Sequence, residues 1–281
     1  IQWFPGHMAK AKREISEKVK LVDLVIELKD ARIPYASTNP MISEIIGNKP
    51  RLILLCKSSM ADPKITKEWI EYYENQNIIA LDIDSITGYH IKDILNNATR
   101  ALKDVFLKRQ AKGITSKTIK AMILGIPNVG KSTLINTMAK RKATTVGDRP
   151  GVTKNQTWIK ISDTLYLLDT PGILWPKFED QMVGVKLAMC GSIKDEILDL
   201  NGLTLASLDY ISKNYPSLLL NRYKIEISDP ETMQEEIGRS RGFLLKGGIV
   251  DIERTNRMFL NELRGMKIGA MSYERPEDES L

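Results

Sequence analysis

Apolar and polar positions alternate along the first 170 residues in a way that predicts strands and helices in turn. Short apolar runs such as RLILLCK (51–57) are typical of buried strands, whereas DPKITKEWIEYYENQ (62–76) repeats its apolar residues at helical spacing. Strands are expected at 21–32, 51–57, 77–84, 118–125, 157–162 and 164–169. Helices are expected at 8–19, 38–47, 62–76, 89–113 and 131–142. This alternation predicts an α/β domain with a mainly parallel sheet and helices on both faces.

The pattern changes near residue 180, where strand-like runs become rare and helical spacing dominates. The helical segments are 180–191, 194–215, 229–245 and 251–266. Together they predict a separate, small all-helical domain of roughly a hundred residues. We therefore expect two domains, residues 1–179 and 180–281. The last ten residues, SYERPEDESL, are polar and are expected to be frayed.

Composition restricts the classes of protein that fit. The chain is 42% hydrophobic and 27% charged, as in a globular protein with a normal core, and none of its apolar runs is long enough for a membrane span. Its N-terminus, IQWFPGHMAKAK, lacks the hydrophobic region of a secretion signal, and its two cysteines make no disulfide framework. We expect a cytoplasmic protein without membrane contact, and nothing in the sequence indicates more than a monomer.

The net charge of +6 permits an acidic partner but does not require one. In one stretch of the helical domain, basic residues outnumber the acidic residues between them. These basic residues are Arg239, Arg241, Lys246, Arg254, Arg257, Arg264 and Lys267. Two interpretations of this stretch are open: a basic face for an acidic partner, or an ordinary solvated helix surface.

The stretch GIPNVGKSTL (125–134) lies between an expected strand and an expected helix. Its pattern, Gly125 followed by Gly130, Lys131 and Ser132, is that of a phosphate-binding loop. Successive backbone N–H groups can wrap phosphate oxygens at the positive end of the helix. These groups belong to Asn128, Val129, Gly130, Lys131, Ser132 and Thr133. Lys131 is expected to reach the β- and γ-phosphates, and Ser132 is expected to hold Mg²⁺.

A second phosphate-side motif, DTPG, begins at the end of the expected strand 164–169. The carboxylate of Asp169 can bind Mg²⁺ through water, and the N–H of Gly172 can sense the γ-phosphate. Between the two motifs, RPGVTKNQ supplies Thr153, whose hydroxyl can complete the Mg²⁺ shell when a triphosphate is bound. DTPG alone fits a tight turn, but at this spacing after GKS it indicates a nucleotide site.

The order of phosphate loop, threonine and DxxG is that of translation-factor-type GTPases. Such proteins also need a guanine-reading N-K-x-D motif and a later S-A-like loop, and nothing after Gly172 supplies either. The residues that match lie upstream: Cys56, Lys57, Ser58 and Ser59 after one expected strand, and Asp84 and Ser85 after the next. The first 124 residues are therefore expected to be the missing half of the same domain, in circularly permuted order.

Several longer motifs resemble those of one family. They are WFPGHMAKA (3–11), DARIP (30–34), GIPNVGKST (125–133), RPGVTK (149–154), DTPGILWPK (169–177) and KGGIVDIERTNRMFLNELRGMKIG (246–269). They span essentially the full length and are similar to those of the circularly permuted ribosome biogenesis GTPase A (RbgA/YlqF) family. The resemblance implies a circularly permuted P-loop GTPase domain and GTP hydrolysis coupled to a late step of large (50S) subunit maturation. It also implies that the helical domain contacts 23S-type ribosomal RNA on the precursor particle.

One motif departs from that family. Where the family has Asn-Lys-x-Asp, this chain has Cys56 at the first position and Ser59 at the last. Ser59 offers one uncharged hydroxyl in place of a charged acceptor for two guanine hydrogen bonds, and Cys56 lacks the amide that ties the loop to the phosphate side. Losing such a contact costs about 1–3 kcal/mol per group. We expect either a weaker guanine preference or another residue, such as Asp62, in this role.

Three interpretations of the function are open. The first is a slow GTPase whose nucleotide state controls binding to a preribosomal particle, which the intact phosphate-side residues favour. The second is a ribosome-binding module that keeps the nucleotide as a structural ligand, with little or no hydrolysis. The third is an ATP-using relative, which only Cys56 and Ser59 indicate.

Hydrolysis cannot rely on the glutamine that many GTPases carry after DxxG, because Ile173 and Leu174 stand there. Asn128 matches a position that helps bind potassium in related GTPases, or it is a loop residue selected for its backbone geometry. The resemblance implies that His7 swings over the γ-phosphate when the ribosomal partner binds, where it can position water. We expect Mg²⁺ and K⁺ as cofactors, GTP and GDP as substrate and product, and a catalytic set of His7, Asn128, Lys131 and Thr153.

Overall fold

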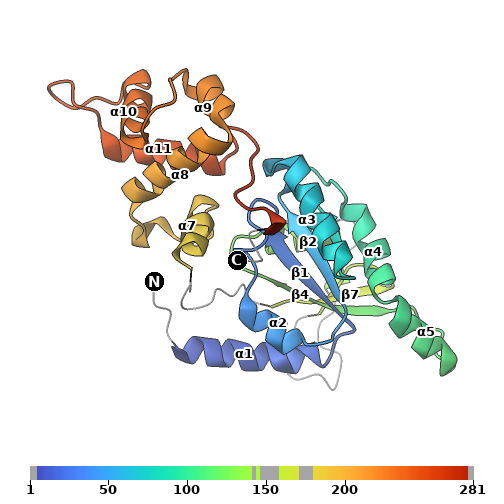
Figure 1. Cartoon of the computed structure of the whole chain (residues 1–281). Coiled ribbons are helices and arrows are strands. Elements are labelled where there is room, and N and C mark those ends of the chain that lie inside the picture. Colours follow the sequence, from blue (N-terminus) through green and yellow to red (C-terminus); the bar gives the residue numbers. More distant parts are fainter. Residues whose placement is uncertain (1–4, 141–143, 146–157, 171–179, 278–281) are drawn as a thin grey trace. The chain divides into compact units, whose positions relative to one another are not determined.

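The computed structural model describes residues 5–140, 144–145, 158–170 and 180–277 (Figure 1). The chain divides into two compact units. The first consists of Ile1–Phe178 together with Ser272–Leu281, and the second of Glu179–Met271. Within the described ranges, no helix is long and apolar enough to cross a membrane.

The first unit is built on a seven-stranded sheet. In chain order its strands are β1 (Leu24–Asp30), β2 (Arg51–Cys56), β3 (Ile79–Asp82), β4 (Ile119–Gly125), β5 (Thr144–Thr145), β6 (Trp158–Lys160) and β7 (Leu165–Leu168). Their order in the sheet is β3-β2-β1-β4-β7-β6-β5, parallel from β3 to β7 and antiparallel at β6 and β5. The mainly parallel sheet is confirmed. The two-residue strand β5 was not predicted, because two residues carry no periodic signal.

Helices cover both faces of this sheet (Figure 1). The helices of this unit are α1 (Pro5–Val19), α2 (Pro40–Ile46), α3 (Pro63–Asn75), α4 (Ile94–Ala101), α5 (Lys103–Ala111) and α6 (Lys131–Lys140), with the 3-10 turns η1 (Ser58–Met60) and η2 (Ile91–Asp93). Clusters of buried side chains that include Val25, Met122 and Ile53 join one face to α1, α2 and α3. The crossovers from β1 to β2 and from β2 to β3 step one way across the sheet, and the crossover from β3 to β4 steps the other way. The right-handed rule therefore places α4 on the other face, where Ile26 and Leu54 are buried.

The single helix expected at 89–113 is divided into η2, α4 and α5. The break between α4 and α5 falls at Leu102, whose φ of −101° and ψ of 12° lie outside the helical range. Leu102 is fully buried, whereas the side chains of α5 are exposed or half-buried. The apolar residues of 89–113 thus keep helical spacing beyond α4, although α5 has no buried residue.

The chain reverses direction across the sheet between β1 and β4. It adds β1, β2 and β3 successively outward on one side, and then returns to place β4 on the other side of β1. In open parallel sheets, ligands bind beyond the carboxyl ends of the strands at such a reversal. Because the phosphate loop follows β4, the topology places it at this point.

The second unit is helical. Its helices are α7 (Gln181–Met189), α8 (Leu200–Asn214), α9 (Pro216–Tyr223), α10 (Pro230–Ser240) and α11 (Ile252–Arg264), with the 3-10 turn η3 (Asp195–Ile197). Helices α7, α8, α10 and α11 each begin at an aspartate that accepts backbone N–H groups of the first turn. Helices α8, α10 and α11 contact one another, and each contributes a fully buried side chain, Leu208, Met233 and Phe259. The expected small all-helical part after the sheet domain is present.

Many basic side chains of the second unit have partners within it. The ion pairs are Arg239–Glu235, Arg241–Glu262, Arg257–Glu253 and Arg264–Asp195. The guanidinium of Arg254 lies 4.2 Å from the centroid of the Phe243 ring. These contacts favour the interpretation of this stretch as an ordinary helix surface.

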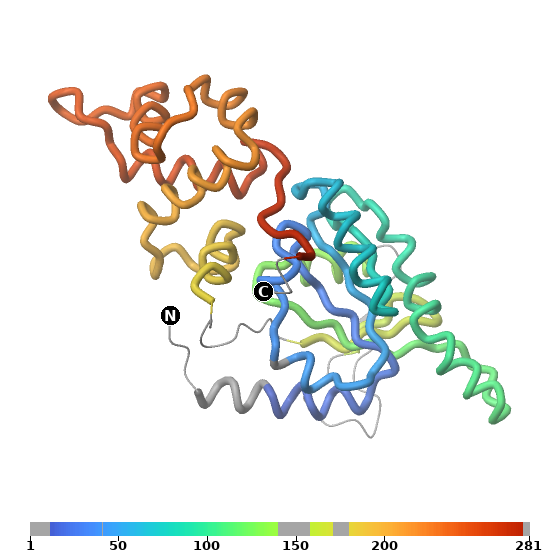
Figure 2. Tube along the Cα trace, viewed as in Figure 1, coloured from blue at the N-terminus to red at the C-terminus, as the bar shows by residue number. Residues whose placement is uncertain are grey.

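The C-terminal segment Ser272–Glu277 belongs to the first unit, so the expectation of a frayed tail in the second domain is wrong for these residues (Figure 2). The Glu274 carboxylate accepts the backbone N–H groups of Tyr35 (2.8 Å) and Ala36 (3.1 Å). The Glu274 carbonyl accepts the indole N–H of Trp69 at 3.1 Å. The polar composition suggested solvent exposure, but these polar groups bind the backbone of a buried loop and leave Glu274 only 1% exposed.

Candidate nucleotide-binding site

Five adjacent parallel strands end at the same edge of the sheet. In the order β3-β2-β1-β4-β7, the residues at or just after their carboxyl ends are Asp84, Lys57, Asp30, Gly125 and Asp169. Motifs that are far apart in the sequence therefore meet along one edge. The predicted base residues lie at the β3–β2 end, and the predicted phosphate residues lie at the β4–β7 end.

The phosphate loop turns sharply before α6. Asn128 and Gly130 have left-handed backbones, with φ of 62° and 109°, and Lys131 begins the helix. Glycine adopts this conformation without strain, and asparagine tolerates it better than most residues. The exposed residues Ser132 and Thr133 follow in the first turn of α6. The backbone of Asn128 thus supplies a reason for an asparagine here that does not involve potassium.

Gly125 is required by close packing. A Cβ at this position would lie 2.8 Å from Cγ1 of Val129 and 3.1 Å from Cβ of Leu28. Leu28 belongs to β1, so the start of the phosphate loop rests directly on the neighbouring strand. The loop can therefore keep its position only with glycine at residue 125.

Lys131 and Asp169 connect the two phosphate-side motifs. The Lys131 ammonium donates to Oδ1 of Asp169 at 2.6 Å, and the Lys131 side chain is 13% exposed. The Thr170 hydroxyl donates to the carbonyl of Ile123 in β4 at 2.6 Å, which fixes the chain just after Asp169. Lys18 donates to the Asp169 carbonyl at 3.2 Å. A cation and a carboxylate are thus held beside the phosphate loop, as a nucleoside triphosphate and its Mg²⁺ require.

Lys57 joins the base loop to the phosphate loop. Its ammonium donates to the carbonyl of Asn128 at 2.7 Å and to Asp30 at 3.2 Å. Asp30 is fully buried and also accepts two hydrogen bonds, of 2.9 and 2.8 Å, from the Arg32 guanidinium. Burial raises the pKa of Asp30, but Arg32 and Lys57 outweigh burial and hold that pKa well below its usual range. Asp30 is therefore an ionised anchor for Lys57.

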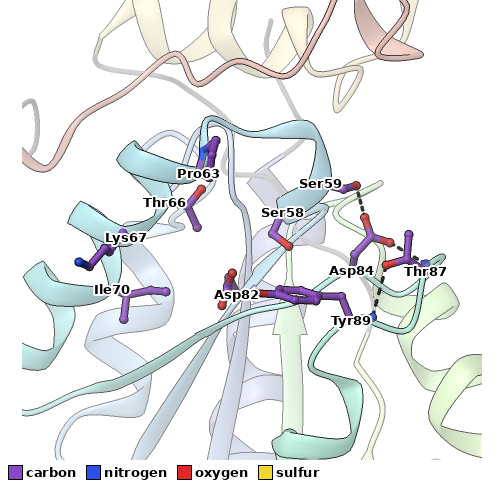
Figure 3. Close-up of a pocket in the computed structure, with 10 residues that line it drawn as sticks. All are labelled: Ser58, Ser59, Pro63, Thr66, Lys67, Ile70, Asp82, Asp84, Thr87 and Tyr89. Atoms are coloured by element: carbon purple, nitrogen blue, oxygen red, sulfur yellow. Dashed lines mark hydrogen bonds between the residues drawn. The ribbon is translucent and has the colours of Figure 1, made fainter.

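Ser59 and Asp84 connect the loops that follow β2 and β3 (Figure 3). The Ser59 hydroxyl donates to Oδ2 of Asp84, while Oδ1 accepts the backbone N–H groups of Ile86 (2.8 Å) and Thr87 (3.0 Å). Ser59 is exposed, whereas Asp84 is 4% exposed. Burial raises the pKa of Asp84, but the hydrogen bonds it accepts outweigh burial and lower that pKa.

A pocket of about 530 Å³ lies beside this pair. Figure 3 shows Thr66 and Lys67 of α3 on one side of the pocket, and Ser59 and Asp84 on the other. Tyr89, from the loop after β3, lies between them. The base end of the site is therefore open enough to admit a ligand group.

The contacts of the other predicted base residues are made mainly by their backbone groups. Cys56 is buried, and burial raises the pKa of its thiol well above the usual range, so the thiol is neutral. The N–H of Ser58 donates to the carbonyl of Ile83 at 3.1 Å. The carbonyl of Ser85 accepts the hydroxyl of Thr137 in α6 at 3.1 Å. This last bond is a second link between the base loops and the helix that follows the phosphate loop.

Asp62, the substitute considered for the missing base residue, caps α3. Its Oδ1 accepts the N–H of Lys64 at 2.9 Å, and its own N–H donates to Oγ of Ser272 at 3.1 Å. The carboxylate that lies beside Ser59 belongs to Asp84. The structure thus offers a different residue for the role that the sequence assigned to Asp62.

Some predicted residues are not placed at the site. Thr153 and Gly172 lie outside the described residues. His7 lies in the first turn of α1, about three turns before Lys18, and its catalytic role stays a prediction. The side chain of Val129 is fully buried, so only its backbone can contribute to a phosphate site.

Sequence reasoning missed Asp30 and Arg32 as parts of this site. Both lie in DARIP, a motif that resembles the family's but to which the sequence alone gives no role. The available signal was a charged cluster directly after an apolar strand, at the edge of the sheet where the other motifs end. Sequence reasoning also placed Asp84 in a base loop without showing that its carboxylate meets Ser59.

The donors at the phosphate end fit Mg²⁺. Asp169 and Ser132 offer a carboxylate and a hydroxyl oxygen, the ligand type that Mg²⁺ prefers, and Mg²⁺ usually shares its shell with phosphates and water. In the described part of the chain, no group of three or more His, Cys, Asp or Glu side chains could hold a metal ion.

Known proteins resemble this chain in sequence and in structure. Residues 120–221 match the protein family described as 50S ribosome-binding GTPase. The chain is 51% identical to ribosome biogenesis GTPase A of Bacillus cereus, over 99% of this chain and 95% of that protein. A solved GDP-bound structure of TM YlqF matches with a TM-score of 0.71 and 28% identity, over 95% of this chain and 100% of that one. GNP-bound YlqF from T. maritima matches with a TM-score of 0.66 and 30% identity, over 95% and 99%.

Proposed function

Because the chain belongs to the ribosome biogenesis GTPase A family, we propose that it hydrolyses GTP and assists assembly of the large (50S) ribosomal subunit. It is a circularly permuted GTPase, in which the base loops after β2 and β3 precede the phosphate loop after β4. Its place of action is the cytoplasm, where bacterial ribosomes assemble, and it acts as a monomer on the precursor particle.

One observation carries this proposal. Three motifs that are far apart in the sequence meet through side chains at one edge of the sheet: Lys131 bonds to Asp169, and Lys57 bonds to the carbonyl of Asn128. This arrangement brings a base loop, a phosphate loop and a metal-side carboxylate together in the order that a nucleoside triphosphate needs. It supports nucleotide hydrolysis more directly than any single motif does.

The roles of the phosphate-end residues follow from their chemistry. Bound Mg²⁺ supplies charge neutralisation at the β- and γ-phosphates. Lys131 leaves Asp169 and binds phosphate oxygens, which releases the Asp169 carboxylate toward the cation. Ser132 and Thr153 would supply hydroxyl oxygens to the same cation, and the N–H of Gly172 would hold the γ-phosphate. Lys131 would then stabilise the charge that develops during phosphoryl transfer.

Positioning of the attacking water requires groups outside the phosphate loop. We assign this role to His7, brought to the γ-phosphate when the ribosomal particle binds, and we assign K⁺ binding to Asn128. The left-handed backbone is a separate reason for an asparagine at residue 128. The potassium requirement is tested by comparing two salts. The rate of GTP hydrolysis in KCl is expected to exceed the rate in NaCl at equal ionic strength.

The second unit is proposed to contact 23S-type ribosomal RNA on the precursor particle. Two of the ion pairs within the unit, Arg239–Glu235 and Arg257–Glu253, are exposed, and exposed pairs of this kind are weak enough to give way to phosphates. Each phosphate contact adds to the salt dependence of binding to a nucleic acid. We therefore expect affinity for the particle to fall as salt is raised.

The test is phosphate release from GTP by the full chain, alone and with purified large or small ribosomal subunits. Slow hydrolysis alone and stimulation by large subunits are expected. Lys131→Ala should abolish both, whereas Lys120→Ala, at an exposed lysine of the same strand β4, should leave both unchanged. A folded chain that releases no phosphate under any of these conditions contradicts the proposed activity. Equal stimulation by small subunits contradicts the proposed partner.

A further inference from the structure

The base end lacks a charged acceptor where an N-K-x-D motif has its aspartate. Ser59 stands at that position, and a hydroxyl can either donate or accept a hydrogen bond. The guanine edge read at this position carries two donors, N1–H and the 2-amino group, so the protein must present an acceptor. Whether Ser59 does so depends on where its own proton lies.

The partner of Ser59 is a buried carboxylate. Oδ2 of Asp84 accepts the Ser59 hydroxyl (Figure 3). Oδ1 accepts the backbone N–H groups of Ile86 and Thr87, which fix the carboxylate in place. Although burial raises the pKa of Asp84, these hydrogen bonds lower it below its ordinary value. The group is therefore ionised near neutral pH and can only accept hydrogen bonds.

An acceptor-only partner fixes the direction of the Ser59 hydroxyl. Its proton lies between Oγ of Ser59 and Oδ2 of Asp84, so the exposed side of Oγ presents lone pairs. We infer that Ser59 and Asp84 together form the guanine-reading acceptor: Ser59 accepts a hydrogen bond from the base, and Asp84 supplies the negative charge behind it. This inference rests on the proposed GTPase function. Adenine presents an acceptor, its own N1, at the same place, and two facing acceptors repel.

The nearby carboxylates are used elsewhere. Asp62 accepts the N–H of Lys64 as the cap of α3. Oδ1 of Asp82 lies 3.1 Å from Nδ1 of His90. Of these three carboxylates, Asp84 is the one that contacts a residue of the base motif, which makes it the specificity-determining residue.

The first step of the test is calorimetric titration of the unaltered full chain with GDP and ADP in the presence of Mg²⁺. The chain is expected to prefer GDP. Absence of this preference contradicts the proposed GTPase function itself, and with it the inference, whatever the variants do. A clear preference makes the variants a test of the inference alone.

Asp84→Asn is the decisive variant. The amide oxygen can still accept the two loop N–H groups, while the amide N–H₂ donates to Oγ of Ser59 and turns the hydroxyl outward as a donor. GDP binding is then expected to weaken about 10- to 100-fold, with ADP binding not weakened. Xanthosine diphosphate, which has an acceptor in place of the 2-amino group, is expected to gain on GDP. Ser59→Ala, at an exposed position, is expected to reduce the GDP preference without disturbing the Asp84 loop.

A charge swap and a control complete the test. Ser59→Asp combined with Asp84→Asn returns a carboxylate to the exposed position with an amide donor behind it, and GDP preference is expected to recover. Asp93→Asn, in the turn η2 that follows the same loop, removes a carboxylate that makes no capping hydrogen bond, and it is expected to leave the GDP-to-ADP ratio unchanged. A ratio unchanged in both Asp84→Asn and Ser59→Ala overturns the inference and leaves the GTPase function standing. An equal loss in Asp93→Asn also overturns it, because the effect would then be a general loosening of the loop.

Discussion

The two ends of the nucleotide site are built in different ways. Among the described residues, the phosphate end consists of one continuous stretch, residues 125–133, and Asp169. The base end is assembled from the loops after two strands, which contribute Lys57, Ser59 and Asp84. The phosphate end keeps the motif of its class, and the base end departs from it. This difference indicates that the two ends depend on different kinds of contact.

The reason lies in the groups that bind. Phosphates are held largely by backbone N–H groups, whose positions depend on loop geometry and on glycine at residue 125. A base is read by side chains, and the parallel sheet brings side chains of the loops after β2 and β3 into contact. Under the inference above, the negative charge of the base end resides on the loop after β3 instead of the loop after β2.

Lys131→Ala is expected to have the largest effect on the phosphate end. Removing the ammonium that is proposed to bind the β-phosphate commonly costs about 2–5 kcal/mol, so GDP affinity should fall roughly 30-fold or more. Stability should change little, because the Asp169 side chain is 42% exposed and can be solvated. Calorimetry and a thermal melt measure both quantities, with Lys120→Ala as the control. GDP affinity close to that of the unaltered chain would show that the loop backbone suffices.

Asp30→Asn is expected to affect the connection between the two ends. The substitution leaves the Arg32 and Lys57 cations without their buried counter-charge, which costs about 3–5 kcal/mol of unfolding free energy. Because the folded pKa of Asp30 is depressed, its contribution is present above its unfolded pKa of about 4 and is lost as pH falls toward the folded pKa.

Urea unfolding of the unaltered chain and of Asp30→Asn at several pH values checks this pH dependence. The difference in unfolding free energy should be constant between about pH 7 and 5 and should shrink below about pH 4. Asp104→Asn, at an exposed position in α5, is the matched control and should show no such difference. A difference that stays the same at low pH would mean that Asp30 acts through shape rather than charge.

Much of the fold and of the phosphate end could be predicted from the sequence, because both depend on local signals. Short apolar runs predicted the parallel strands, and the spacing of Gly125, Lys131 and Ser132 predicted the phosphate loop. The Ser59–Asp84 bond could not be predicted, because it joins two loops whose proximity depends on strand order. The buried position of Glu274 was missed for the same reason: its partners lie more than 200 positions away in the chain.

Gly125→Ala tests whether the phosphate end depends on geometry alone. The added Cβ would clash with Val129 and Leu28, and overpacking of this kind costs about 1–3 kcal/mol. Both stability and GDP affinity should fall, because the loop must shift away from β1. In the control Gly113→Ala no atom lies within 4 Å of the new Cβ, so it should lose only about 1 kcal/mol from its left-handed backbone and keep GDP affinity. Equal GDP affinity in the two variants would show that the loop tolerates displacement.

Cys56→Asn is expected to have the smallest effect on GDP affinity. This variant tests which residue joins the base end to the phosphate end. The sequence suggested that this position lacks an amide that ties the base loop to the phosphate side. In the structure Lys57 makes that tie, through the carbonyl of Asn128, and the Cys56 side chain is buried. Restoring the amide should therefore change GDP affinity by less than about fivefold, roughly 1 kcal/mol. Lys57→Met, which keeps the apolar stem and removes the ammonium, should weaken GDP binding at least about tenfold. Calorimetry on the two variants measures GDP affinity for each position. If Cys56→Asn strengthens GDP binding more than Lys57→Met weakens it, the link between the loops belongs at residue 56. The base end of this chain would then be incomplete rather than rearranged.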